Sequence, residues 1–156
     1  MTGFCLGAGL ILALCCDFRI ASQKTVFALS EIKIGMAVLA STQRITSVAS
    51  IAATKELVLL GQRINAQAAF TYGFVCQVVP ADQLDLAVNI LADKFRKLPP
   101  LAIAIAKRII NQGYRLSLRE SQHLEIDSRA QLLDTPGFHE AVKSYLEKRT
   151  PRFIGD

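Results

Sequence analysis

The chain lacks the features that mark several special classes of protein. Its 156 residues include no tryptophan and five prolines, and they show neither a G-X-Y period nor a repeat of fixed length. These absences exclude collagen-like, linker and solenoid architectures. A hydrophobic fraction of 51% also excludes intrinsic disorder. We therefore expect one soluble globular domain.

Metal-ligating residues are few and badly spaced. The four cysteines have no CxxC spacing, and neither histidine lies near one of them in sequence. We expect no metal site, reduced thiols that lie mostly in the core, and histidines on the surfaces of helices. The residues concerned are Cys5, Cys15, Cys16, Cys76, His123 and His139.

Residues 1–16 are almost wholly apolar, but they do not match a membrane anchor. They lack a positively charged start, and the run stops at Asp17, short of the roughly 20 residues that a bilayer requires. Glycines come first and the apolar run 10–16 follows, which predicts a turn that leads into a buried helix. Such a turn directs backbone N–H groups at a phosphate or an oxyanion. The GxGxxG and Walker patterns are both missing, which disfavours dinucleotide-binding and P-loop folds.

The hydrophobic pattern predicts an α/β front followed by a helical back. Short β-branched segments predict strands over residues 18–21, 25–29 and 74–79, with a turn between the first two. Helical spacing and capping signals predict helices over 42–50, 52–60, 66–72, 83–98 and 99–111. Gly61 and Gly73 are expected to end the second and third of these helices. Ser117 and Glu120 form a capping box that opens another helix, and Thr135-Pro136 opens the last, which extends to residue 149.

Glu31 is the candidate for acid–base chemistry. It stands among apolar neighbours directly after a predicted strand, where desolvation makes a carboxylate a more effective base. Two other interpretations are open: an ordinary first-turn residue favoured by the helix dipole, or an ion-pair partner of Lys33. Neither histidine has a neighbouring nucleophile, so a Ser-His-Asp or Cys-His arrangement has no support.

The positive charge leaves the partner open. The net charge is 18 − 13 = +5, which permits an anionic partner such as nucleic acid, a membrane surface or a phosphorylated ligand. The basic residues of the helical back have no interleaved aromatic stripe on which bases could stack, so we expect a solvated face and no nucleic acid. These residues are Lys94, Arg96, Lys97, Lys107 and Arg108.

Five segments in order along the chain resemble the enoyl-CoA hydratase/isomerase (crotonase) superfamily. They cover residues 3–22, 27–35, 60–69, 73–75 and 145–153. The resemblance implies an α/β, crotonase-like (ββα-superhelix) core that lacks its first units, followed by a C-terminal helical region. It places a partial core at residues 1–80 and a helical trimerisation region at 81–156, in homotrimers or hexamers.

The resemblance also implies a site on the glycine turn. The backbone N–H of Ala8, between Gly7 and Gly9, would contact the thioester oxygen of an acyl-CoA. Family hydratases have one glutamate where this chain has Ile11 and a second where it has Glu31. A single carboxylate is sufficient for a reaction in which one base moves a proton between two carbons. The resemblance therefore implies isomerisation of a 3-enoyl-CoA to a 2-enoyl-CoA through a thioester enolate, as in fatty acid metabolism.

Two other functions stay open at this point. One is an enoyl-CoA hydratase with a different helper residue, and the other is a non-catalytic CoA-binding or assembly module. Lys148 and Phe153 are implied contacts to the CoA of a neighbouring subunit. No cofactor is expected apart from coenzyme A as part of the substrate, and the cytoplasm is the expected compartment.

Two departures from the family pattern carry further expectations. After Gly35 the family has Pro-Gly and further glycines, whereas residues 36–44 are largely apolar and hold none. Met1 also aligns well inside the family fold, so the first βαβ units, with the second oxyanion donor and most of the adenine pocket, are expected to be absent. A fragment, a truncated gene, or an open face covered by another chain would each explain this.

Overall fold

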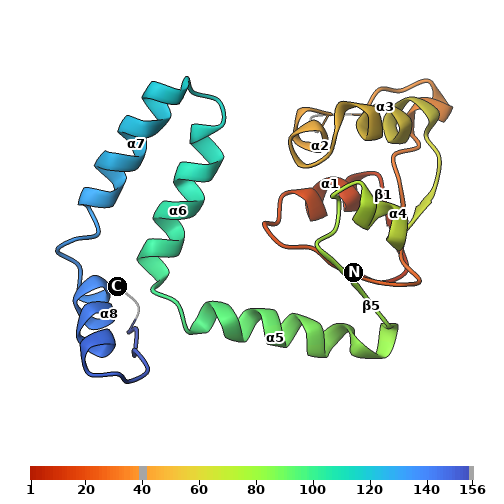
Figure 1. Ribbon diagram of the computed structural model, residues 1–156. Coiled ribbons are helices and arrows are strands. Elements are labelled where there is room, and N and C mark those ends of the chain that lie inside the picture. Colours follow the sequence, from red (N-terminus) through yellow and green to blue (C-terminus); the bar gives the residue numbers. More distant parts are fainter. Residues whose placement is uncertain (39–41, 155–156) are drawn as a thin grey trace. The chain divides into compact units, whose positions relative to one another are not determined.

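The computed structural model describes residues 1–38 and 42–154 (Figure 1). It consists of two compact units, Met1–Asn89 and Ile90–Asp156. The division falls inside a helix, α5 (Leu84–Arg96), and not at a linker. The proposed limits of 1–80 and 81–156 stay a prediction.

The first unit contains a three-stranded sheet with the order β1-β3-β4. β1 (Phe4–Leu6) pairs in parallel with β3 (Val26–Ala28), and β4 (Ile64–Asn65) pairs antiparallel on the other side of β3. The loop after β1 leads directly into α1 (Ala8–Leu14), as the order of glycines and apolar residues predicts. This strand–turn–helix unit positions the candidate site.

A second, two-stranded sheet joins β2 (Ile20–Ser22) in parallel to β5 (Gln77–Val79). The two early strands are confirmed, and the Thr25 N–H donates to the Ser22 carbonyl at the turn between them (3.0 Å). They belong to different sheets, so each one pairs with a segment other than its neighbour in sequence.

The predicted strand over 74–79 is shorter in the structure. The N–H groups of Phe74 and Val75 both donate to the Ala69 carbonyl, at 2.8 and 3.3 Å, and so are not available to a strand. The buried Arg19 side chain also donates from Nε to the Phe74 carbonyl at 2.5 Å. Residues 74 and 75 are therefore buried in a loop, and only 77–79 form a strand.

Short helices connect and cover these strands. They are η1 (Glu31–Ile34), α2 (Thr42–Val48), α3 (Ile51–Leu60), α4 (Ala66–Thr71) and η2 (Ala81–Gln83). Ser50 and Asn65 cap α3 and α4 by accepting backbone N–H bonds at 3.1 and 2.8 Å. The family-pattern departure after Gly35 falls partly on residues 39–41, which lie outside the described residues.

The core of the first unit is a cluster of buried apolar side chains. Its members include Leu10, Leu14, Phe27, Leu29, Ile45, Leu57 and Phe74. The expectation that the cysteines lie mostly in the core is wrong, because only Cys5 is buried. Cys15 and Cys16 stand beyond the last turn of α1, and Cys76 lies in the loop before β5, so all three are exposed.

The second unit is helical. After α5 come α6 (Pro100–Gly113), α7 (Leu118–Ala130) and α8 (Pro136–Leu146). Figure 1 shows α6 and α7 as an antiparallel pair, and Arg108 on α6 donates to Ser128 Oγ on α7 at 3.2 Å. The capping box is confirmed: Ser117 Oγ accepts the Glu120 N–H, and the Glu120 carboxylate accepts the Ser117 N–H at 2.9 Å.

The last helix ends earlier than predicted. α8 stops at Leu146, because Lys148 adopts a left-handed φ of 54°, which no helix can contain. His123 and His139 are exposed on α7 and α8, as predicted. The described residues hold no group of three or more His, Cys, Asp or Glu that could bind a metal ion. In the described part of the chain, no helix is long and apolar enough to cross a bilayer.

Candidate active site

Gly7 forms the turn between β1 and α1. Its φ of 47° and ψ of −123° define a conformation that only glycine adopts readily. The Gly7 N–H donates to the Ala28 carbonyl at 2.9 Å, which fixes the turn to the end of β3. Its carbonyl accepts from the Ile11 N–H at 3.1 Å and so begins the helix.

The first turn of α1 presents backbone donors. Ala8 and Gly9 are its first two residues, and both are exposed. The N–H groups at the start of any helix have no acceptor within the helix, and the helix dipole adds positive potential there. Ala8 is thus placed where its N–H can contact an oxygen that gains negative charge.

Glu31 lies against this turn. It is the first residue of η1, three positions after the end of β3. A Cβ built on Gly7 would stand 3.2 Å from Glu31 Oε1, so the carboxylate and the glycine turn are neighbours. The structure therefore brings together two features that are 24 residues apart in sequence (31 − 7 = 24).

The other carboxylate oxygen, Glu31 Oε2, is buried and has no hydrogen-bond partner among the described residues. Nor does any described ion pair join Glu31 to Lys33, one of the alternatives left open by the sequence. Burying a carboxylate oxygen without a donor is unfavourable, and such groups are rare in folded proteins. The arrangement leaves this oxygen free to accept a proton from a bound molecule.

Ile11 lies one helical turn after Gly7. Its side chain is partly buried and packs against the core of the first unit. The sequence of α1, Ala8–Leu14, contains no Asp or Glu, so this helix supplies no second carboxylate.

Lys148 and Phe153 belong to the second unit, in the segment that follows α8. Lys148 is exposed and Phe153 is partly buried. Their contact with coenzyme A stays a prediction, as do the roles assigned to Gly7, Ala8, Gly9, Ile11 and Glu31.

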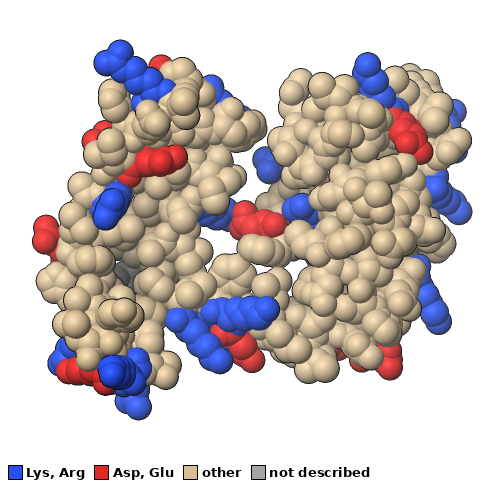
Figure 2. Space-filling model, in the orientation of Figure 1, with Lys and Arg blue, Asp and Glu red and all other residues tan. Residues whose placement is uncertain are grey.

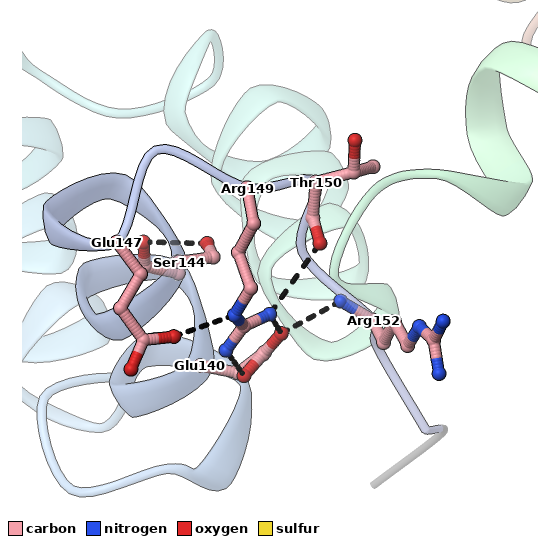
Figure 3. Close-up of polar contacts among 7 residues, drawn as sticks. Glu140, Ser144, Glu147, Arg149, Thr150 and Arg152 are labelled. Atoms are coloured by element: carbon pink, nitrogen blue, oxygen red, sulfur yellow. Dashed lines mark hydrogen bonds and ion pairs between the residues drawn. The ribbon is translucent and has the colours of Figure 1, made fainter.

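An ion-pair cluster that the sequence analysis missed fixes this final segment (Figure 3). Arg149 donates from both terminal nitrogens to Glu140, at 2.6 and 2.8 Å, and from Nε to Glu147 at 2.6 Å. The Arg152 N–H also donates to Glu140, at 2.8 Å. Hydrogen bonds from Arg149 and Arg152 lower the pKa of Glu140 to about 2, and hydrogen bonds to Glu140 and Glu147 raise the pKa of Arg149. Helical periodicity gives no signal for contacts between residues nine and twelve positions apart.

The basic residues do not form a continuous stripe on the face shown in Figure 2. Lys and Arg side chains there stand singly or in small groups among uncharged residues. This dispersion is typical of a solvated surface.

Comparison with known proteins decides the family. A family model described as enoyl-CoA hydratase/isomerase matches residues 1–156. The chain belongs to the enoyl-CoA hydratase/isomerase family. The crystal structure of an enoyl-CoA hydratase from Bacillus anthracis aligns with a TM-score of 0.95 and 34% identity, over 99% of this chain and 60% of that one. The predicted crotonase-like α/β fold is thereby confirmed.

Two curated relatives show the extent of the match. A probable mitochondrial enoyl-CoA hydratase of Dictyostelium discoideum is 36% identical over 97% of this chain and 55% of its own length. A 2,3-dehydroadipyl-CoA hydratase of Escherichia coli (strain K12) is also 36% identical, over 99% of this chain and 61% of its own length. The chain thus spans between 55% and 61% of the length of these relatives.

Proposed function

We propose that this chain carries the acid–base part of an acyl-CoA site, in which Glu31 moves a proton along a 3-enoyl-CoA to give the 2-enoyl-CoA. One observation carries the proposal: the buried Glu31 Oε2 has no donor among the described residues, while Oε1 lies beside the glycine turn. A base without a donor and an oxyanion-binding turn are the two groups that enolate chemistry requires.

The proposed reaction consumes no water and no oxidant. The thioester oxygen accepts the Ala8 N–H, which stabilises negative charge on that oxygen. Glu31 takes a proton from C2, and the electron pair of the broken C–H bond passes into a dienolate. The protonated Glu31 then returns the proton to C4, and the double bond moves from C3–C4 to C2–C3. The carboxylate is regenerated and the product has the mass of the substrate.

Ile11 supports isomerisation over hydration. Water addition by a pair of carboxylates requires one group to hold the water and another to exchange protons with it. The resemblance to the family implies that Ile11, an aliphatic side chain packed against the core, stands where the hydratases carry the first glutamate. The site therefore lacks a second carboxylate from α1 with which to hold a water molecule.

Hydration is the second candidate, and the names of the relatives favour it. Both curated relatives described above, and the Bacillus anthracis structure, are named as hydratases. The two reactions separate in the Ile11→Glu variant. If the chain is an isomerase because it lacks the first carboxylate, this variant gains water addition to a 2-enoyl-CoA.

The proposal extends to the setting of the site. We propose an acyl-CoA thioester as substrate, with coenzyme A entering only as part of it and no metal involved, and a homotrimer or hexamer as the assembly. We also propose that the chain binds neither nucleic acid nor a membrane. The cytoplasm is the proposed compartment, although one relative is mitochondrial by name.

The test uses a 3-enoyl-CoA and the 156-residue chain. Formation of the conjugated thioester is followed spectroscopically, and acyl-CoA affinity is measured by calorimetry for the wild type, Glu31→Gln and Glu125→Gln. Glu125 is exposed on α7 and serves as the matched control. We expect conversion by the wild type and by Glu125→Gln, with affinity retained but conversion lost in Glu31→Gln. Binding without conversion by the wild type would favour a non-catalytic module.

A further inference from the structure

Gly61 lies at the end of α3, directly against the segment that carries Glu31. It is buried and adopts a left-handed φ of 57°, which ends the helix. A Cβ at this position would stand 2.9 Å from Ile32 Cγ2, 3.3 Å from Lys33 Cε and 3.4 Å from the Leu29 carbonyl oxygen. These atoms belong to residues on both sides of Glu31.

The backbone hydrogen bonds around Glu31 are local to η1 and the residues that flank it. η1 is a single short turn, with the Lys33 N–H bonded to the Ser30 carbonyl and the Met36 N–H bonded to the Glu31 carbonyl, both at 3.0 Å. The buried carboxylate oxygen Oε2 has no hydrogen-bond partner among the described residues, so no polar contact at this atom fixes the side chain. Its position therefore depends on how η1 packs, and α3 packs against η1.

From this contact we infer that Gly61 is a positioning residue for Glu31: the missing side chain lets the end of α3 support η1, and so holds the carboxylate against the Gly7 turn. The inference rests on the proposed role of Glu31 as the base. A Cβ at position 61 would force Ile32 Cγ2 to move, and we expect η1 to move with it. A base displaced by about 1 Å from its reacting carbon loses about a hundredfold in rate.

Gly3 supplies the matched control for backbone strain. Its φ of 70° resembles that of Gly61, but no atom of the described residues lies within 4 Å of the Cβ that a substitution would add. Gly3→Ala therefore incurs the cost of positive φ without a steric contact. Gly61→Asn is the second test variant, because asparagine tolerates left-handed φ but still carries a Cβ.

The substitution Ile32→Ala should restore the activity of the Gly61→Ala variant. In the described part of the chain, only the Cγ2 atom of Ile32 lies within 3.0 Å of the added Cβ. The Ile32 side chain is partly exposed, so Ile32→Ala removes the clash without emptying the core. The remaining contacts, to the end of a flexible lysine and to a carbonyl at ordinary distance, can be accommodated. A general loss of stability would not be restored by removing this methyl group.

The experiment measures kcat, KM and Tm for the 156-residue chain and its variants. We expect Gly61→Ala and Gly61→Asn to lower kcat about ten- to a hundredfold with KM changed by less than about threefold, while Gly3→Ala retains kcat. The double variant Gly61→Ala/Ile32→Ala should recover kcat to within about threefold of Ile32→Ala alone. Full kcat in Gly61→Asn, an equal loss in Gly3→Ala, or no recovery in the double variant would overturn the inference.

A spectroscopic readout separates this inference from the proposed function. The ¹³C carboxyl signal of Glu31, assigned by its absence in Glu31→Gln, should shift in both Gly61 variants, remain in place in Gly3→Ala, and return in the double variant. If the wild type shows no turnover, the proposed isomerase function is refuted. The ¹³C signal would still show whether Gly61 positions Glu31. An unshifted signal in the Gly61 variants would refute that role whether or not the chain turns over substrate.

Discussion

The two units present glutamates in opposite environments. In the first unit, Glu31 has a buried oxygen with no donor among the described residues. In the second, Glu140 accepts three hydrogen bonds from Arg149 and Arg152, and its pKa falls to about 2. A carboxylate that is fully hydrogen-bonded is a poor proton acceptor, whereas one without donors can accept a proton from substrate. The comparison supports the proposed chemical role of Glu31 and indicates an anchoring role for Glu140.

The largest expected effect comes from Glu31→Gln. Loss of the base should lower the isomerisation rate by about 10²–10⁴-fold, because the amide cannot accept the proton. Tm should fall no further than in Glu125→Gln, since the buried Oε2 atom has no hydrogen bond to lose among the described residues. A rate close to that of Glu125→Gln would break the contrast between the two glutamates.

Glu140→Gln should have the opposite signature. The amide cannot pair with both Arg149 nitrogens and the Arg152 N–H as a carboxylate does, so the segment after α8 loosens. We expect faster hydrogen exchange at the Arg152 amide, with kcat retained. Glu147→Gln, which removes only the single bond to Arg149 Nε, is the milder control. Loss of kcat in Glu140→Gln with unchanged exchange would contradict an anchoring role.

Acid should act on the second unit through Glu140. Its pKa is lowered from 4.5 to about 2 in the folded state, so the contribution of this group to stability is complete above about 4.5. That contribution is lost as the pH falls through this interval toward 2, when the carboxyl group is protonated. Exchange at the Arg152 amide, measured from about pH 6 to about pH 2 and corrected for intrinsic rates, should rise over this window in the wild type. A flat profile would count against the ion pairs with Arg149.

The smallest expected effect is on stability alone. Ser117→Ala removes one half of the capping box that begins α7 and should lower the free energy of unfolding by about 1 kcal/mol. Thermal or urea unfolding measures this, with Gln122→Ala, at an exposed position inside α7, as the control. The isomerisation rate should not change, because Ser117 is not one of the proposed site residues. A lower isomerisation rate, measured at a temperature where Ser117→Ala is still folded, would show that the chemistry also depends on the second unit.

Local signals in the sequence predicted local structure well. Ser117 and Glu120 identified a helix start, and Gly61 and Gly73 identified helix ends, because caps depend on residues three or four positions apart. The strand positions near residues 20 and 26 followed in the same way from their β-branched composition.

Contacts between distant residues were not predictable in this way. The residues in and around β2 do not indicate whether this strand pairs with β5 or with β3, because strand pairing depends on the packing of the whole unit. The Arg149 contact to Glu140 and the left-handed Lys148 likewise escaped detection, and α8 was predicted too long.

The candidate site shows both cases. The sequence singled out Glu31 as an isolated carboxylate, but its position beside Gly7 and the absence of a donor to Oε2 among the described residues emerge only from the fold. Gly61 appeared in the sequence as a helix end. Its contact with Ile32 depends on how α3 meets η1, which no pattern within either segment encodes.

The most direct test of the central claim is the fate of a 3-enoyl-CoA added to the wild-type chain and to Glu31→Gln. Calorimetry shows whether each protein binds it, and spectroscopy with mass measurement shows what is formed. We expect similar binding to both proteins, and a conjugated product of unchanged mass from the wild type alone. Undiminished conversion by Glu31→Gln, or a wild-type product heavier by one water, would contradict this expectation.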